Sequence, residues 1–258
     1  MSIKKIGLVA LLIIMCSASA SKAQSINVWG AEATVGVSHG EFSYPILSTP
    51  STTEWYTVHE DNEFSSNIIY WNQSVTGTSA ASSNPVPSPI GSPSQANGVA
   101  IFDAAYLGQL GLLNGGGGYA ASIISPRIDL TGFAGLPITA KFYAMSGSGW
   151  NDCSIRLSTD DGATWVQTTT YSPTPLPYDA ADWVNVEFPG SITAGVADMT
   201  QCRIKFFAGW VIQYSMVDDL TLSTDCISSF GSVTETAMDS YTSPSGNYTW
   251  TGTDTYID

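Results

Sequence analysis

The stretch that decides the fold is Gln201-Cys202-Arg203-Ile204-Lys205-Phe206-Phe207-Ala208. Its even-numbered residues, from Cys202 to Ala208, are all apolar, whereas Arg203 and Lys205 between them are cations. Successive side chains of a β-strand point to opposite faces, so a period of two predicts a strand with one face in the core and one toward solvent.

Three other segments repeat this alternation, and no window of 12 residues shows a convincing helical period. The closest helical pattern, Ala104 to Leu113, is interrupted by Gly108 and Gly111. Strands that bury one face predict antiparallel sheets packed as a sandwich, so the fold class is all-β. The alternating segments are Leu136–Ala144, Asp152–Ser158 and Asp182–Phe188, and the shorter predicted strands are Glu54–Val58, Asn67–Trp71, Gly98–Phe102, Tyr119–Ile124, Thr164–Thr170 and Val217–Ser223.

The composition excludes two classes of protein. Apolar residues make up 43% of the 258 residues and charged residues 12%, which argues against intrinsic disorder. With 22 acidic and 8 basic side chains the net charge is -14, and no Lys/Arg cluster follows residue 22. Nucleic acid is therefore excluded as a partner, and an acidic surface suits a secreted protein or one that takes up divalent cations.

The first 23 residues have the features of a secretory signal peptide. Lys4 and Lys5 precede the apolar run from Ile6 to Met15, and small residues follow it. The run is shorter than the roughly 20 residues that cross a bilayer, so we expect cleavage after Ala23, with an uncleaved anchor as the alternative. No later stretch could span a membrane, and we expect the mature protein to be secreted or attached to the cell surface.

The rest of the chain divides by composition. We expect an N-terminal strand or lead-in over 24–53, the sandwich over 54–225, a linker over 226–238 and a Ser-, Thr- and Tyr-rich segment over 239–258.

Six phrases within the predicted sandwich occur in a characteristic order. That order resembles the jelly-roll modules of secreted bacterial proteins related to the MAM and cleaved-adhesin domains. The resemblance implies a concanavalin-like or MAM-like β-sandwich. The phrases are Asn97–Asp103, Ile124–Leu130, Arg156–Trp165, Asp182–Val186, Arg203–Phe206 and Val217–Leu220.

The tail Asp239–Trp250 resembles a short β repeat found in tandem in large secreted adhesin-like proteins. Such repeats usually have Cys where this chain has Met238. Because the chain stops at Asp258, soon after the phrase, we expect a truncated repeat and a chain that is a fragment of a larger protein.

Ser158–Trp165 fits the Asp-box pattern of sialidases and other β-proteins. Asp160 can accept backbone N–H bonds within the turn, Gly162 can adopt a positive φ, and Trp165 can fold back over the hairpin. We therefore interpret these three residues as a structural turn. A sialidase would show several such boxes, and this chain has one.

Asp218 is the most informative acidic residue. It shares its parity with Met216, Leu220 and Leu222, so it falls on an apolar face. A buried carboxylate needs hydrogen bonds or a cation. Two interpretations stay open: N–H bonds from a neighbouring loop, or a structural Ca²⁺ ion shared with Asp103. Related jelly rolls often carry structural calcium, so calcium is the one cofactor that the resemblance implies.

Cys153 and Cys202 both fall on core-facing positions of separate predicted strands. In an exported protein we favour a disulfide between them, with buried free thiols as the alternative. Cys226, in the predicted linker, looks unpaired.

Trp150, in a Gly- and Ser-rich loop, and Trp183, at an outward position, are the tryptophans best placed to stack on sugar rings. For each of them, packing against the protein is the alternative. Trp29, Trp55 and Trp71 are expected to pack.

No motif of metal or nucleophilic catalysis is present in the sequence. We therefore expect a non-catalytic extracellular binding or adhesion module of a larger secreted or cell-surface protein, with a glycan or a surface protein as its partner. An accessory domain of an exported hydrolase is the alternative, and a glycoside hydrolase is a third.

Overall fold

The computed structural model describes residues 25–30, 40–43, 45–60, 71–81, 89–110, 119–147, 152–170, 181–211, 213–225, 241–242 and 249–250. The predicted signal peptide (1–23), the linker (226–238) and Trp150 lie outside these residues. One compact unit spans Asn27–Thr224. In the other unit, two short strands lie within the predicted repeat and pair with each other, β12 (Tyr241–Thr242) and β13 (Thr249–Trp250).

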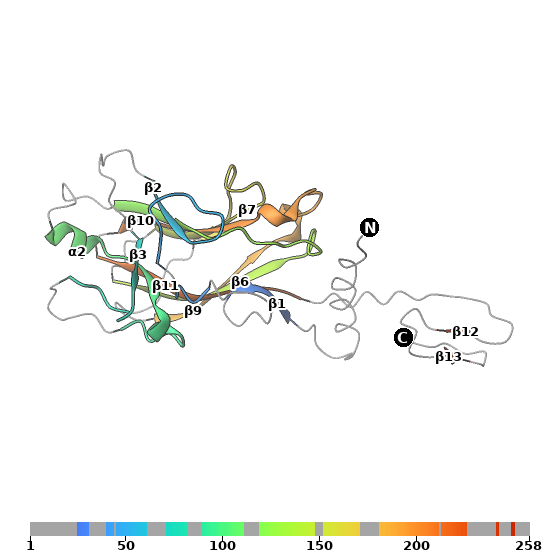
Figure 1. Cartoon of the computed structure of the whole chain (residues 1–258), viewed down its shortest axis with the longest axis horizontal. Helices are drawn as coiled ribbons and strands as arrows, with labels where there is room; N and C mark the ends of the chain where they lie inside the picture. The colour runs from blue at the N-terminus through green and yellow to red at the C-terminus, as the bar shows by residue number, and fades with distance from the viewer. Residues whose placement is uncertain are drawn as a thin grey trace. The chain divides into compact units, whose positions relative to one another are not determined.

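Two sheets form the larger unit, and they face each other as two layers in Figure 1. Sheet A runs in the order β3-β4-β11-β6-β9, with β1 also paired to β11. Its strands are β1 (Ser25–Gly30), β3 (Trp71–Ser74), β4 (Val99–Phe102), β6 (Ile138–Ser146), β9 (Ala181–Phe188) and β11 (Ser215–Asp225).

Sheet B runs in the order β2-β5-β10-β7-β8. Its strands are β2 (Tyr56–His59), β5 (Tyr119–Ile124), β7 (Asp152–Ser158), β8 (Val166–Thr170) and β10 (Arg203–Val211). The four pairings within this sheet are all antiparallel. The predicted all-β sandwich is confirmed.

Helical structure in the described part of the chain is limited to short pieces. The helix α2 (Ala104–Gln109) falls in the one segment with a partial helical period; it includes Gly108 and ends before Gly111. The 3₁₀ turns are η2 (Gln95–Asn97), η3 (Gly190–Ile192) and η4 (Met199–Gln201).

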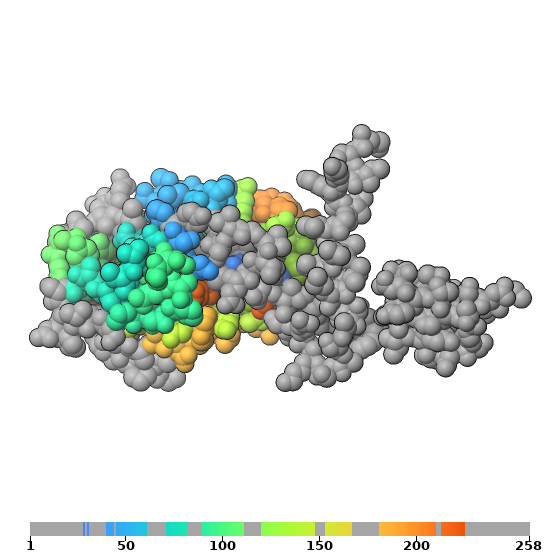
Figure 2. Space-filling view, turned by 60° about the horizontal axis from the view of Figure 1, so that its bottom comes forward, coloured from blue at the N-terminus to red at the C-terminus, as the bar shows by residue number. Residues whose placement is uncertain are grey.

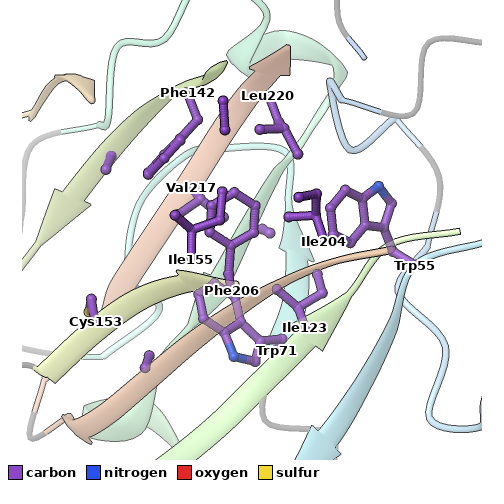
Figure 3. Close-up of a cluster of buried hydrophobic side chains, with 14 of the residues drawn as sticks. Trp55, Trp71, Ile123, Phe142, Cys153, Ile155, Ile204, Phe206, Val217 and Leu220 are labelled. Carbon is purple, nitrogen blue, oxygen red and sulfur yellow. The ribbon is translucent and has the colours of Figure 1, made fainter. Parts of the chain in front are cut away.

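The main core lies between the two sheets and is shown in Figure 3. Phe142 of sheet A meets Phe206 of sheet B edge-on, with ring centroids 4.9 Å apart. Trp55 and Trp71 are buried at this interface, as expected. The even-numbered positions of β10 supply Ile204, Phe206 and Ala208 to the core, so the alternation that indicated a strand also selected its buried face.

A β-bulge in β11 changes the face on which its side chains lie. Asp218 pairs with Tyr143 and Thr221 with Lys141, so three steps on β11 match two on β6. Asp219 has a φ of +51°, which accommodates the extra residue. The predicted alternation is therefore wrong beyond Asp218. Val217 and Leu220 both enter the main core, whereas Asp218 faces the outer side of sheet A.

A second, smaller apolar cluster covers part of that outer side. It comprises Ile90, Val99, Ile101, Met145, Tyr214 and Met216. Ile90 belongs to the segment 89–97, which precedes β4. Residues 71–81 and 89–110, teal to green, gather on one face of the molecule in Figure 2. The segment 89–97 therefore covers part of β11.

The predicted disulfide between Cys153 and Cys202 is wrong, because both residues are buried thiols and no disulfide joins them. In the antiparallel register of β7 and β10, Cys153 lies opposite Ala208, six residues beyond Cys202. Six strand residues span about 20 Å, far more than the roughly 6 Å that a disulfide allows between Cα atoms. The alternation in the sequence correctly placed both thiols in the core. It did not show that they lie at opposite ends of the β7–β10 pair.

Candidate functional site

The hairpin between β7 and β8 carries the Asp box. Asp160 Oδ1 accepts hydrogen bonds from the Thr164 backbone N–H at 2.8 Å and from Ser158 Oγ at 2.7 Å. Gly162 has a φ of +90°, and a Cβ there would lie 3.2 Å from the Trp165 ring. The hydrogen bonds from Thr164 lower the pKa of Asp160. These contacts are all local and belong to the turn itself.

Asp161, next in the turn, joins the hairpin to the body of sheet B. Its carboxylate accepts a bond from Arg203 Nε at 2.6 Å and binds Arg127 through two nitrogens. Arg203 is buried although it faces outward, and its Nη1 donates to the carbonyls of Ser51 and Ser125. The two guanidinium groups, that of Arg127 first, hold the pKa of Asp161 well below its usual value.

The outer face of sheet B pairs cations with aromatic rings. Lys205 Nζ lies 4.8 Å from the centroid of Trp165, and Arg156 Cζ lies 4.7 Å from that of Phe207. Arg203 stands 5.5 Å from the ring of Tyr56. We call these six residues the cation–aromatic face. The sequence indicated that Arg203 and Lys205 point outward, but not that rings would cover them.

Lys205 also forms an ion pair. Its Nζ lies 3.0 Å from Glu60 Oε1, which accepts a second hydrogen bond from Ser122 Oγ at 2.6 Å. The Lys205 side chain is only 7% exposed, so its charge is balanced by a partner that comes from the end of β2.

Asp218 lies under the segment that covers β11. It is fully buried and accepts hydrogen bonds from the hydroxyls of Ser92 and Ser94. Its other oxygen, Oδ1, has no hydrogen-bond partner among the described residues. Burial raises the pKa of Asp218 to about 7, against the opposing effect of the Ser92 hydroxyl. The sequence pattern predicted that this carboxylate is buried. The structure places it on the outer side of sheet A, outside the main core.

Asp103 has a different role. Its Oδ1 accepts from the Tyr106 N–H at the start of α2 and from Ser79 Oγ, and its Oδ2 accepts from the Ala80 N–H. In the register of β4 and β11, Phe102 pairs with Ser215 and Ala100 with Val217. Asp103 and Asp218 therefore lie beyond opposite ends of this paired segment. The structure does not bring together the two carboxylates that the sequence suggested as ligands of one ion.

Trp183 lies on the outer side of β9, 37% exposed. Directly opposite it in the register is Tyr143, whose ring stands nearly perpendicular at a centroid distance of 5.2 Å. Lys141 Nζ lies 4.1 Å from the centroid of the Trp183 ring. We call these three residues the Trp183 platform. Sequence reasoning missed Tyr143 and Lys141, although their shared outward parity on one strand was a signal for them.

Among the described residues, no three His, Cys, Asp or Glu side chains cluster in a way that could hold a metal ion. Nor is any helix in the described ranges both long and apolar enough to cross a membrane.

Comparison with known proteins gives structural likeness only. No family model and no curated protein matches the chain. The carbohydrate-binding module TmCBM61, solved with β-1,4-galactotriose, is 14% identical with a TM-score of 0.35, over 66% of this chain and 88% of its own. The K1 cleaved-adhesin domain of Lys-gingipain from Porphyromonas gingivalis W83 is 13% identical with a TM-score of 0.36, over 72% and 95%.

A cyclase from Fischerella sp. TAU is 15% identical with a TM-score of 0.46, over 78% of this chain and 98% of its own. Similarity at this level does not specify what a protein does.

Proposed function

We propose that this protein is a non-catalytic extracellular binding module that holds a neutral face of a glycan on the Trp183 platform. The observation that carries the proposal is the exposure of Trp183 on a strand rather than on a loop. An aromatic ring offers apolar area with little conformational entropy to lose, and a strand fixes its direction before the ligand arrives.

The neighbours of Trp183 support this role. The perpendicular ring of Tyr143 limits rotation of the indole, and Lys141 Nζ carries three N–H donors. In the part of the chain that the structure describes, Lys141 forms no ion pair, so its donors are available to sugar hydroxyls. The platform thus combines an apolar ring with adjacent polar donors, as sugar-sized ligands require.

Export and context complete the proposal. The signal-peptide features of residues 1–23 support a secreted location, and the repeat-like tail supports a place in a larger secreted or cell-surface protein. An adhesion function, with a surface protein as the partner, is the alternative.

The test is a glycan array probed with the mature protein and with Trp183→Ala, followed by titration calorimetry on the best ligand. Leu110→Ala is the matched control, because Leu110 is 51% exposed and lies at the end of α2, away from β9. We expect at least a tenfold loss of affinity for Trp183→Ala and none for Leu110→Ala. Equal binding by all three proteins, or cleavage of the bound glycan, would reject the proposal.

A further inference from the structure

The positive charges of this acidic protein are unevenly distributed. Of its eight Lys and Arg residues, Lys4, Lys5 and Lys22 precede the predicted cleavage site, which leaves five. Four of those five lie on sheet B or on the segment that follows β5, namely Arg127, Arg156, Arg203 and Lys205. The fifth, Lys141, belongs to the Trp183 platform.

Three of the four cations have carboxylate partners. Arg127 and Arg203 share Asp161, and Lys205 pairs with Glu60. Arg156 differs, because within the described ranges it contacts Ser154 Oγ at 3.1 Å and the ring of Phe207, but no carboxylate.

Arg156 lies at the centre of the cation–aromatic face. In the register of β7 and β10 it is directly opposite Lys205, on the same face of the sheet. The charge of Lys205 is balanced by Glu60. Arg156 therefore carries the one positive charge of this face that has no carboxylate partner among the described residues.

The surroundings fix this charge in place. The guanidinium stacks on Phe207 and is tied to Ser154, while Lys205 is held over Trp165. Stacked and hydrogen-bonded cations lose little side-chain entropy when an anion arrives, and a planar guanidinium suits carboxylate and sulfate geometry.

From this arrangement we propose that the cation–aromatic face is a second binding site, which takes one anionic group of a sugar, a carboxylate or a sulfate, with Arg156 as its main ligand. The partly exposed rings of Trp165 and Phe207 supply apolar contact to the sugar beside that group. The net charge of -14 repels dense polyanions, so an isolated charge on an otherwise neutral glycan fits better than a polyanion.

The test is an NMR titration of the mature protein with methyl glucuronide, glucose 6-sulfate and the neutral methyl glucoside. We expect both charged sugars to bind at least tenfold more tightly than the neutral one, and their relative affinities identify the preferred group. A short peptide with one Glu is a fourth ligand. Binding of that peptide as tight as that of the charged sugars would refute a sugar site.

Two matched variants locate the site. Arg156→Gln should lose at least tenfold in affinity for the charged sugars, whereas Arg127→Gln, whose guanidinium is already paired with Asp161, should lose none. The opposite pattern would move the anion to Arg127 and overturn the proposal. If Arg156→Gln fails to fold, Arg156→Lys is the second variant. It keeps the positive charge but not the planar guanidinium, and should show an intermediate loss of affinity for the charged sugars.

The cation–aromatic face and the Trp183 platform lie on different sheets, so either proposal can be contradicted without the other. Loss of charged-sugar binding in Trp183→Ala would contradict the second site, while loss of neutral-glycan binding in Arg156→Gln would contradict the first.

Discussion

Arg203 and Asp161, 42 positions apart in the chain, meet at 2.6 Å between Nε and Oδ1 and fasten the Asp-box hairpin to β10. The Arg203 side chain is 4% exposed, so its charge depends on this partner and on two backbone carbonyls. The contact turns a local turn motif into part of the tertiary structure of sheet B.

Asp161→Asn should therefore destabilise the protein by about 2–4 kcal/mol, because it leaves a buried guanidinium without its counter-charge. Arg127→Gln is the matched control: the Arg127 arm of the same cluster is 41% exposed, and its loss should destabilise the protein far less than Asp161→Asn does. Urea unfolding of the two variants measures both values. Equal losses would mean that the cluster acts as a surface ion pair.

Asp218 predicts a pH dependence of the opposite kind to that of Asp161. Its pKa is raised to about 7 in the folded protein, against roughly 4 in the unfolded chain. The folded state therefore holds the proton more tightly, and the contribution of Asp218 to stability falls as pH rises from about 4 to about 7. Asp161 has a lowered pKa, so its contribution to stability is present above about pH 4 and is lost as the pH falls below it.

Asp218→Asn isolates that effect. With chelator present, the variant should gain stability relative to the wild type by roughly 1.4 kcal/mol per pH unit across the middle of that range. Unfolding free energies at pH 5, 6 and 7 provide the measurement. A constant difference between the two proteins would show that Asp218 does not titrate there.

We propose a structural calcium ion at Asp218. Oδ1 of Asp218 is buried and has no hydrogen-bond partner within the described ranges. This atom and the neighbouring hydroxyls of Ser92 and Ser94 are oxygen donors, which Ca²⁺ prefers. Asp103 is not a ligand in this proposal, since both of its oxygens already accept hydrogen bonds.

Millimolar Ca²⁺ should then raise the melting temperature above that measured in chelator. If the ion is present at a hundred times its Kd, the free energy of unfolding should increase by about 2.7 kcal/mol. Asp218→Asn should abolish the difference, and Asp103→Asn should keep it while losing stability at α2. If Ca²⁺ does not change the melting temperature and Asp218→Asn does not destabilise the protein, the proposed calcium site is contradicted.

The two buried thiols should be unreactive in the native protein. Burial, assisted by Asp129 and Asp198, raises the pKa of Cys202 to about 12, so almost no thiolate exists at neutral pH. We expect a thiol reagent to label Cys153 and Cys202 only after denaturation, and reduction to leave the intact mass unchanged. A mass gain of two protons on reduction would show a disulfide after all.

The sandwich could be predicted because the alternation in β6, β7, β9 and β10 is a direct consequence of burying one face of each strand. The hairpin turn was equally readable, since Asp160 and Gly162 act within a few residues of each other. Signals of this kind are local and need no knowledge of distant partners.

Contacts between distant segments were not readable. Nothing near Asp218 in the sequence indicates that Ser92 would cover it, and nothing near Arg203 indicates Asp161. The disulfide prediction was wrong for the same reason: parity gives the face of Cys153 and Cys202 but not their register.

The bulge at Asp219 also determines which deletions β11 can tolerate. Asp219 is the extra residue, so a chain shortened by it alone would return to plain alternation with Val217 and Leu220 still pointing inward. Removal of Thr221 instead would turn Leu222 to the outer side and invert every residue after it. A deletion at Asp219 therefore keeps the core-facing residues of β11 in place, whereas a deletion at Thr221 exchanges inside for outside.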